Sequence, residues 1–260
     1  MVRRVNKGAS MKFSYSAVWA DTVAMLRANA SLIAGIAGVF IFLPALLVAH
    51  FLPQPEGAAT MAAMMADMEA YLSANWHWML LANVVNMLGS IAIYLLLFDP
   101  RGRTVGSAIG CALPILPFYF ILSVLVGLIV IFGLFWLILP GIYLIGRLAP
   151  STPLMVAEGR RSPFDALRRS WRLTGKRGWA VAGLIVIVFV VGYIVIAAVT
   201  AVIGSIFLLA LGREGLGGLL VAIIGAALSA ILSTVMLVLA AALYRHLVAV
   251  RESSQPAAAD

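Results

Sequence analysis

Long apolar stretches separated by short polar segments run through most of the chain. A helix rises ~1.5 Å per residue, so a stretch of about 20 apolar residues can cross a hydrocarbon core ~30 Å thick. Six stretches have this character, at about 30–52, 78–98, 112–130, 134–152, 179–203 and 219–244. The pattern predicts an all-α, polytopic transmembrane helical bundle of about six spans, formed as a single domain over residues 13–250.

Prolines mark several expected boundaries of these spans. Pro53 and Pro55 end the first span, and Pro114 and Pro117 are expected to kink the third. The turn between the third and fourth spans falls within 127–141, and Pro140 with Gly141 is the expected structural hinge. Residues 204–218 are expected to form a short loop between the last two spans.

Two segments outside the spans have the spacing of amphipathic helices in the membrane interface. In the segment from Ser14 to Arg27, apolar or small side chains recur at Val18, Thr22 and Met25. In the segment 58–72 a methionine stripe repeats at helical spacing. We expect both to be interfacial helices, on opposite sides of the membrane.

A third amphipathic segment, 162–176, is strongly basic. Ser162 can cap a helix, Pro163 suits its first turn, and Asp165 complements the helix dipole. A helical wheel places the apolar side chains on one face, namely Phe164, Leu167 and Trp171. It places four cations on the opposite arc, namely Arg168, Arg169, Arg172 and Lys176. These cations either bind anionic lipid headgroups or only fix the orientation of the protein in the membrane.

A weak internal repeat links the short helices to the spans. The segments Ala17–Asp21, Ala108–Ala112 and Ala166–Ser170 each precede a span. Each could be an elbow helix that leads into a two-helix hairpin, although the spacing between the three is uneven. Three such units would account for six spans.

Composition agrees with a membrane protein. Of 260 residues, 63% are hydrophobic and 11% are charged, against roughly 45–50% and 25% in soluble domains. The single cysteine, Cys111, excludes an intramolecular disulfide. The basic residues 1–12 and the polar residues 251–260 are expected to be tails, the second one disordered.

The placement of charge predicts the topology. With six spans both termini share one side, and of the 18 Lys and Arg residues only Arg213 falls on the other. The positive-inside rule therefore places both termini in the cytoplasm of a bacterial cell, with the chain in its inner membrane.

Polar residues inside the spans form two rows. Asn83, Asn86 and Ser90 share a face of the second span, which Tyr94 extends. Gly225, Ser229 and Ser233 form a small-residue row on the sixth. We expect both rows to face other helices, either as packing contacts or as part of a transport pathway. No span carries an acidic residue at mid-depth, as transporters usually do.

Arg147 is the one charged residue in a long apolar tract. If the fourth helix begins at Pro140, Arg147 lies ~10 Å below the outer surface and needs a partner. If the turn lies earlier, near Gly133, Arg147 reaches the cytoplasmic headgroups. Arg147 thus either has a structural role, paired within the protein or snorkelling to the headgroups, or contacts a lipid phosphate or another ligand.

The residue types expected in a catalytic or metal site do not occur in suitable patterns. His50 and His77 lack ligand spacing, and no G-x-S-x-G or P-loop sequence is present. The methionine stripe has the spacing of any interfacial helix, although methionine thioethers are also conceivable ligands for copper(I). We expect no enzyme activity, no metal and no cofactor.

The segment 138–179 resembles the membrane domain associated with glycerophosphoryl diester phosphodiesterases and related bacterial six-helix membrane proteins. The resemblance rests on Ile138-Leu139-Pro140-Gly141-Ile142-Tyr143, Arg147, Glu158, Ala166-Leu167-Arg168-Arg169-Ser170-Trp171 and Gly178-Trp179. Some family members carry a soluble phosphodiesterase barrel, for which this chain has no stretch of sufficient length and polarity. The resemblance therefore implies a membrane setting and no activity.

We expect a non-enzymatic module that binds membrane lipids, in particular anionic phospholipids, and that supports glycerophospholipid homeostasis or a membrane-protein partner. Nucleic acid is not an expected partner. The alternative is a transporter of lipids or small molecules, which would need a continuous polar cavity joining Asn83, Asn86 and Arg147.

Overall fold

The computed structural model describes residues 13–52, 60–98, 104–212 and 215–254. Residues 1–12, 53–59, 99–103, 213–214 and 255–260 lie outside these ranges. Pro53, Pro55 and Arg213, named above, are among them. The regular elements of the described part are all helices.

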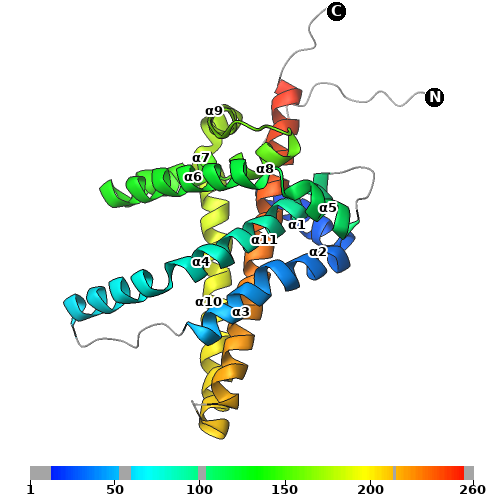
Figure 1. The fold of residues 1–260 in the computed structure, drawn as a ribbon. Coiled ribbons are helices and arrows are strands. Elements are labelled where there is room, and N and C mark those ends of the chain that lie inside the picture. The colour runs from blue at the N-terminus through cyan, green and yellow to red at the C-terminus, as the bar shows by residue number, and fades with distance from the viewer. Residues whose placement is uncertain (1–12, 53–59, 99–103, 213–214, 255–260) are drawn as a thin grey trace, which may run out of the picture.

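The helices follow one another with short connections (Figure 1). In chain order they are α1 (Tyr15–Ala28), α2 (Ala30–Ala37), the π-helix η1 (Gly38–Phe42), α3 (Leu43–Phe51), α4 (Met61–Phe98), α5 (Val105–Ala112), α6 (Leu116–Trp136), α7 (Ile138–Leu148), α8 (Ser151–Ala157), α9 (Pro163–Thr174), the 3₁₀-helix η2 (Gly175–Arg177), α10 (Gly178–Leu211) and α11 (Leu216–Ser254).

Five helical stretches of the described part are long and apolar enough to cross a membrane. They are Ala30–Phe51, Met61–Phe98, Leu116–Trp136, Pro163–Leu211 and Leu216–Ser253. The prediction of an all-α, polytopic membrane protein is therefore confirmed. The expected fourth span is not among the five.

The fourth span was expected at 134–152, but the chain divides this region differently. Helix α6 continues to Trp136, Leu137 is extended, and the return path consists of α7 and the short helix α8. The return is broken at Ala149 and Pro150, because Pro150 and Pro153 each lack a backbone donor for a continuous helix. The hinge lies at Leu137, one turn before Pro140.

Prolines also begin α6 instead of kinking it. Helix α5 ends at Ala112, a turn follows, and Pro117 lies in the first turn of α6. Proline is well tolerated there because the first-turn amides have no partner inside a helix. The expected kink in a helix from 112 onwards is thus a boundary between two helices.

The expected interfacial helix 58–72 and second span 78–98 are one helix, α4, of 38 residues. No glycine or proline separates the two parts, so nothing in the backbone ends the helix between them. The methionine stripe stays exposed along the first half of α4. The last two helices are likewise longer than expected, and α11 includes the first four residues of the expected tail.

Three short helices each precede a longer helical hairpin, as the internal repeat predicted. Helix α1 leads into α2–α3 and α4, α5 into α6 and α7, and α9 into α10 and α11. Each of α1, α5 and α9 begins with a side-chain hydroxyl that accepts a backbone N–H three residues later. The capping residues are Ser14, Thr104 and Ser162.

Burial follows the same register in all three short helices. The fourth residue after each cap is buried, and so is the eighth. These residues are Val18 and Thr22 in α1, Ala108 and Ala112 in α5, and Ala166 and Ser170 in α9. The first unit of the repeat is therefore shifted by one residue from the sequence alignment, which placed Ala17 opposite Ala108.

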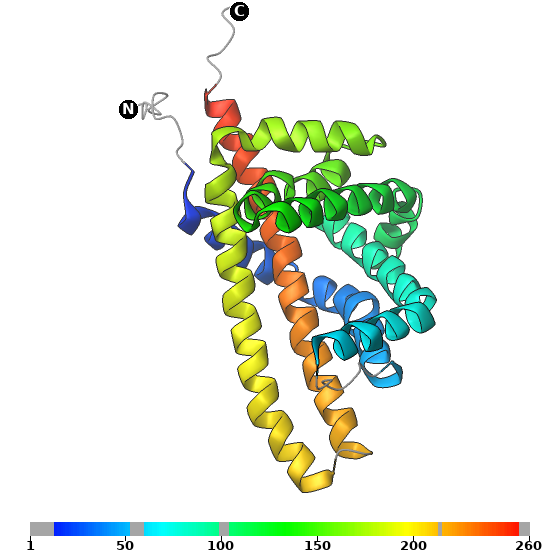
Figure 2. The ribbon, with the colours of Figure 1, turned by 90° about the vertical axis from the view of Figure 1, so that its left-hand side faces the viewer.

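The start of α1 lies beside the end of α11. The backbone N–H of Ser14 donates to His246 Nε2 at 3.3 Å, and Arg245 forms an ion pair with Asp21 at 3.5 Å. Helices α8 and α9 pack against the same part of α11. We call this end of the molecule, formed by α1, α8, α9 and the last turns of α11, the hub (Figure 2).

Helices α10 and α11 extend away from the hub as a long antiparallel pair (Figures 1 and 2). Gly192 of α10 faces Leu232 of α11, and Gly204 faces Val221, so the two helices approach closely at two levels. The connection between them is only Gly212–Gly215, much shorter than the expected loop 204–218.

Candidate functional site

Helix α9 lies across the end of α10 (Figure 2), so the chain turns sharply between them. The turn is made at Gly175, whose φ of 51° is accessible to glycine at little cost. The 3₁₀-helix η2 follows and leads into α10. Helix α9 is therefore an elbow helix, as the sequence predicted, with the expected cap at Ser162 and with Pro163 in its first turn.

The face of α9 that packs on the protein consists mainly of small side chains. Ala166, Ser170, Leu173 and Thr174 are buried. The Ser170 hydroxyl donates to the carbonyl oxygen of Arg147 at 2.8 Å, and the Thr174 hydroxyl lies 3.3 Å from the same oxygen. Small side chains let α9 approach α7 closely enough for these contacts.

The expected apolar face of α9 is thus not the face that packs on the protein. Phe164 is 62% exposed and Trp171 is 42% exposed, while Leu167 packs partly against the core. The two aromatic side chains lie on the arc between the buried face and the cations. The helical wheel grouped the large apolar side chains of α9 on one face. It did not identify the neighbouring face of mainly small side chains, which packs on the protein.

Three of the four expected cations of α9 are exposed. They are Arg168, Arg172 and Lys176. Together with Phe164, Trp171 and the 54% exposed Trp179 of α10, they form what we call the elbow surface. It combines exposed positive charge with exposed aromatic rings, which is the combination found on helices that lie in a membrane interface.

Arg169 is directed instead to a carboxylate within the hub. Its Nε lies 3.3 Å from Glu158 Oε1, and Arg160 Nε lies 2.6 Å from Glu158 Oε2. The Tyr244 hydroxyl of α11 also donates to Glu158 Oε1, at 3.3 Å. Glu158 therefore ties the α8–α9 connection to both α9 and α11.

The electrostatics of Glu158 follow from these contacts. Partial burial opposes ionisation of the Glu158 carboxyl, but the hydrogen bonds and charges of Arg160 and Arg169 together outweigh it and hold its pKa below the ordinary value. Glu158 is thus a carboxylate over the physiological pH range. The sequence pointed to it only through the family resemblance.

Arg147 is buried, with 7% of its surface exposed. Its Nη1 donates to the carbonyl oxygen of Gly175, and its guanidinium carbon lies 4.0 Å from the centre of the Trp171 ring and 5.6 Å from that of Tyr143. The cation is stabilised by a backbone carbonyl and two aromatic faces, and no carboxylate of a described residue contacts it.

Aromatic rings enclose Arg147 on its outer side. Tyr143 lies edge-on to Trp171 at 6.3 Å and tilted against Trp179 at 5.3 Å. The Nε of Arg147 is buried without a partner. The guanidinium of Arg147 is thus packed within the protein beside the α9–α10 turn, and its contact with a lipid phosphate stays a prediction.

Pro140 and Gly141 lie in the first turn of α7. A Cβ on Gly141 would clash with Leu134 of α6, and one on Gly146 would clash with Gly178 and Ala182 of α10. These two glycines bring α7 against α6 at one end and against α10 at the other. The second contact sets Arg147 beside the α9–α10 turn.

The polar row on α4 leads into the protein interior at one end only. Asn83 is exposed, Asn86 is half-buried, and Ser90 is buried and donates to the carbonyl oxygen of Asn86 at 2.9 Å. Further along, Thr152 of α8 lies beside the hydroxyls of both Tyr94 and Tyr119. Only the Ser90 end of the row is buried, and the hydrogen bonds described for the row do not include Arg147.

The small-residue row on α11 was expected to face other helices, and this prediction is wrong for the described chain. Ser229 and Ser233 are exposed, and a Cβ on Gly225 would meet no atom within 4 Å. The row buried instead is Ala226, Ala230 and Thr234. Both rows have small side chains at helical spacing, so the sequence did not distinguish them.

Two described pockets are mainly apolar, and neither is lined by Asn83, Asn86 or Arg147. One lies between α2 and α11, and the other follows the methionine stripe of α4. Within the described ranges, no three His, Cys, Asp or Glu side chains are grouped in a way that could hold a metal ion. The charged, polar and aromatic side chains of the described residues are therefore concentrated in the elbow surface and in the contacts of Arg147 beneath it.

Sequence reasoning missed the groups that hold the elbow in place. Ser170, Thr174 and Gly175 contact Arg147 across 23 to 28 residues of chain, and a local pattern contains no sign of these contacts. The available sequence signal for the buried face was a small or apolar residue at the fourth and eighth positions after each helix cap, because this pattern recurs in all three short helices.

Comparison with known proteins agrees with the resemblance seen in the sequence. No curated protein and no solved structure matches the chain. A family model described as the membrane domain of glycerophosphoryl diester phosphodiesterase matches residues 116–256, which is more than half of the 260 residues and includes α6 to α11. The chain therefore belongs to the family of the membrane domain of glycerophosphoryl diester phosphodiesterase.

Proposed function

We propose that this protein is a non-enzymatic module of the bacterial inner membrane that binds anionic phospholipid headgroups at the elbow surface of α9. Both termini and the hub would lie in the cytoplasm. The observation that carries the proposal is the exposure of Arg168 and Arg172 of α9 and of Lys176 of η2, beside Phe164 and Trp171 of α9, whose opposite face packs on the protein.

The division of labour among the basic residues supports the proposal. Arg147 and Arg169 have partners inside the hub, so they hold α9 in place. The three exposed cations have no ion-pair partner among the described residues. Each basic residue near an anionic membrane surface contributes about 1 kcal/mol at most, and salt weakens the attraction.

Membership of the family suggests the biological setting. Its name connects the domain with glycerophosphodiester metabolism, so a role in glycerophospholipid homeostasis or in supporting a lipid-processing membrane partner fits a headgroup-binding module. The transporter alternative gains no support from the two described pockets, because neither joins the polar row of α4 to Arg147.

The test replaces the three exposed cations of α9 with glutamine, as Arg168→Gln, Arg172→Gln and Lys176→Gln together. The phospholipid that copurifies from native membranes is then quantified by mass spectrometry. We expect phosphatidylglycerol and cardiolipin to fall relative to phosphatidylethanolamine. The orientation of the protein should be unchanged, because most of its basic residues remain.

The matched control removes the same amount of charge from the N-terminal tail, as Arg3→Gln, Arg4→Gln and Lys7→Gln. If the elbow surface is a binding site, the control retains the anionic lipid that the α9 variant loses. Equal lipid content in all three proteins, or a mixed orientation only in the α9 variant, would show that these cations merely orient the protein.

A further inference from the structure

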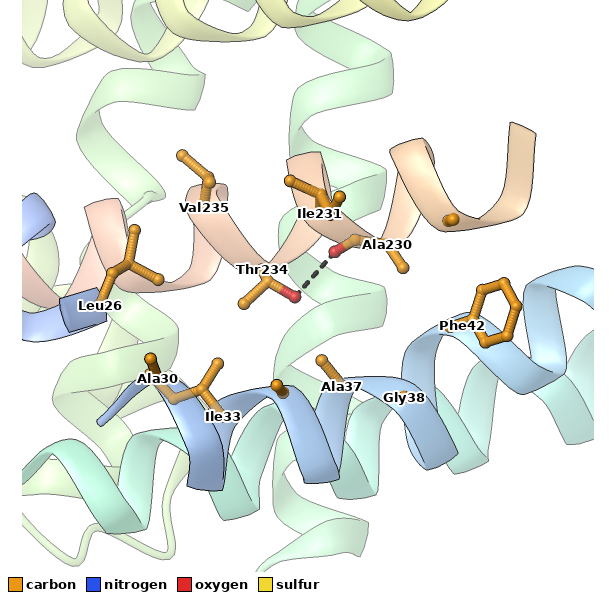
Figure 3. Close-up of a pocket in the computed structure, with 12 residues that line it drawn as sticks. Leu26, Ala30, Ile33, Ala37, Gly38, Phe42, Ala230, Ile231, Thr234 and Val235 are labelled. Atoms are coloured by element: carbon orange, nitrogen blue, oxygen red, sulfur yellow. Dashed lines mark hydrogen bonds between the residues drawn. The ribbon is translucent and has the colours of Figure 1, made fainter. Parts of the chain in front are cut away.

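An apolar groove lies between α2–η1 and the middle of α11, away from the elbow surface. Its volume is about 480 Å³, within the range of ~300–1,000 Å³ that is usual for small-molecule sites. Figure 3 shows Ala30, Ile33 and Ala37 below the groove, Ala230 and Thr234 above it, and Leu26 and Phe42 at its two ends.

Small side chains and a break in helix geometry create this groove. Ala30, Ala34 and Gly38 on one side face Ala227 and Ala230 on the other, so no large side chain fills the space. The π-helix η1 ends two residues before Pro44, which has no N–H for the helix ladder and crowds the carbonyl four residues earlier, within η1. Such π-turns are often associated with functional sites.

The groove offers contacts to hydrocarbon and to little else. Thr234 carries the one polar side chain among the described lining residues, and its hydroxyl donates to the carbonyl oxygen of Ala230 at 2.7 Å. A ligand in the groove therefore finds no free hydrogen-bond donor. In a membrane such a space is filled by an apolar chain.

The shape of the groove fits a lipid chain and excludes a helix. Its two walls, η1 and α11, contact each other, so a helix about 10 Å across cannot enter between them. From Ala30 to Phe42 the chain rises ~18 Å, close to the ~15 Å that one leaflet contributes to the hydrocarbon core.

The residue that follows Leu26 is a cation, although it does not itself line the groove. Arg27 follows Leu26, is exposed, and has no ion-pair partner among the described residues. The nearby carboxylate of Asp21 is already paired with Arg245. An exposed positive charge is thus adjacent in the chain to Leu26, which lines the groove.

We propose that this groove binds one acyl chain of an anionic phospholipid whose phosphate is held by Arg27. The site is separate from the elbow surface of α9, so it goes beyond the function proposed above. It would attach a lipid to α1, α2 and α11 and stabilise the contact between the first and the last helix of the bundle.

The probe is phosphatidylglycerol with a photoreactive diazirine in one acyl chain, incorporated with the full-length protein into nanodiscs. We expect crosslinks, mapped by mass spectrometry, to concentrate in 26–42 and 227–235. Ala34→Leu with Gly38→Leu fills the groove, since a Cβ on Gly38 meets no atom within 4 Å. This variant should lose at least about fivefold of that labelling.

Gly35→Leu is the matched control, because Gly35 lies on the same helix, has open space around its Cβ and does not line the groove. Its labelling should equal that of the wild type. Arg27→Gln should lower labelling to the level obtained with a photoreactive phosphatidylcholine, and Arg27→Lys should restore it.

Three outcomes would overturn the proposal. One is unchanged groove labelling in the Ala34→Leu/Gly38→Leu protein, and another is labelling spread evenly over the exposed face of α10. The third is crosslinking between copies of the chain at these residues, which would assign the groove to self-association. The α9 triple variant should leave groove labelling unchanged, so the two lipid sites can fail independently.

Discussion

Arg147 is a buried cation whose partners are all supplied by neighbouring helices. A charge in hydrocarbon costs several kcal/mol unless it is paired or hydrated. Here the Gly175 carbonyl and the faces of Trp171 and Tyr143 replace water. A planar guanidinium can stack on a ring and donate in its own plane at the same time, which an ammonium group cannot do.

We therefore expect both Arg147→Lys and Arg147→Leu to destabilise the protein, by roughly 1–3 kcal/mol. The measurement is thermal unfolding in detergent. Arg172→Leu serves as the control, because Arg172 is exposed on the adjacent helix, and it should be nearly neutral. An Arg147→Lys protein as stable as the wild type would show that the stacked geometry is unimportant.

Glu158 gives a prediction that depends on pH. Its pKa in the folded protein lies below the ordinary value of 4.5, so its contribution to stability is fully present above that value and is lost as the pH falls through the folded pKa. We expect Glu158→Gln to lower the unfolding temperature near neutral pH, with a cost of roughly 0.5–1 kcal/mol.

The difference between wild type and Glu158→Gln should shrink as the pH is lowered past 4.5, because the wild-type carboxyl is then protonated as well. The same thermal series on Arg168→Gln, a change at an exposed residue of α9 with no ion-pair partner among the described residues, should show no such convergence. A difference that stays constant down to low pH would mean that the ion pairs of Glu158 do not stabilise the fold.

At the scale of elements, glycines set where helices cross. A Cβ on Gly146 would clash with the backbone of Gly178 and with Ala182, and one on Gly178 would clash with Tyr143 and Arg147. This close crossing of α7 and α10 positions the Arg147 cluster beneath α9. The position of the elbow surface therefore depends on Gly146 and Gly178, which are not part of that surface.

Gly146→Ala should lower stability by about 1–3 kcal/mol, because backbone atoms cannot move away as a flexible side chain could. Gly183→Ala is the matched control, since Gly183 lies in α10 and its Cβ would meet no atom within 4 Å. A glycine-to-alanine change in a helix with free space is neutral or slightly stabilising. Equal unfolding temperatures for the two variants would contradict the close crossing.

The comparison of α9 with α4 and α11 shows which element features the sequence contains. Ser162, Pro163 and Asp165 act on their own helix, so the start of α9 was predictable from local chemistry. The division of 58–98 into two helices was wrong because the expected boundary depended on the membrane interface, and no residue there breaks a helix. The prediction that Ser229 and Ser233 face other helices was wrong because a helical wheel shows which residues share a face but not what that face packs against.

At the scale of the whole molecule, the contact between α1 and α11 constrains the topology. Ser14 and His246 are hydrogen-bonded, so the start of α1 and the end of α11 lie next to each other, and we expect them on the same side of the membrane. Five single crossings would put them on opposite sides. We therefore expect the α6 hairpin to return to its starting side through α7 and α8, although these helices are too short to count as a span individually.

This parity and the distribution of charge predict one arrangement, with the hub in the cytoplasm. In a Cys111→Ser background, Asp165→Cys should react with a membrane-impermeant maleimide only when the cytoplasmic face is opened. Thr60→Cys and Gly215→Cys, at the start of α4 and between α10 and α11, should react in intact cells. Cys111→Ser alone is the unlabelled control, because Cys111 is the single cysteine and is exposed. Labelling of position 165 in intact cells would invert the arrangement, and it would place the elbow surface against the outer leaflet, where the positive-inside rule provides no reason for its cations.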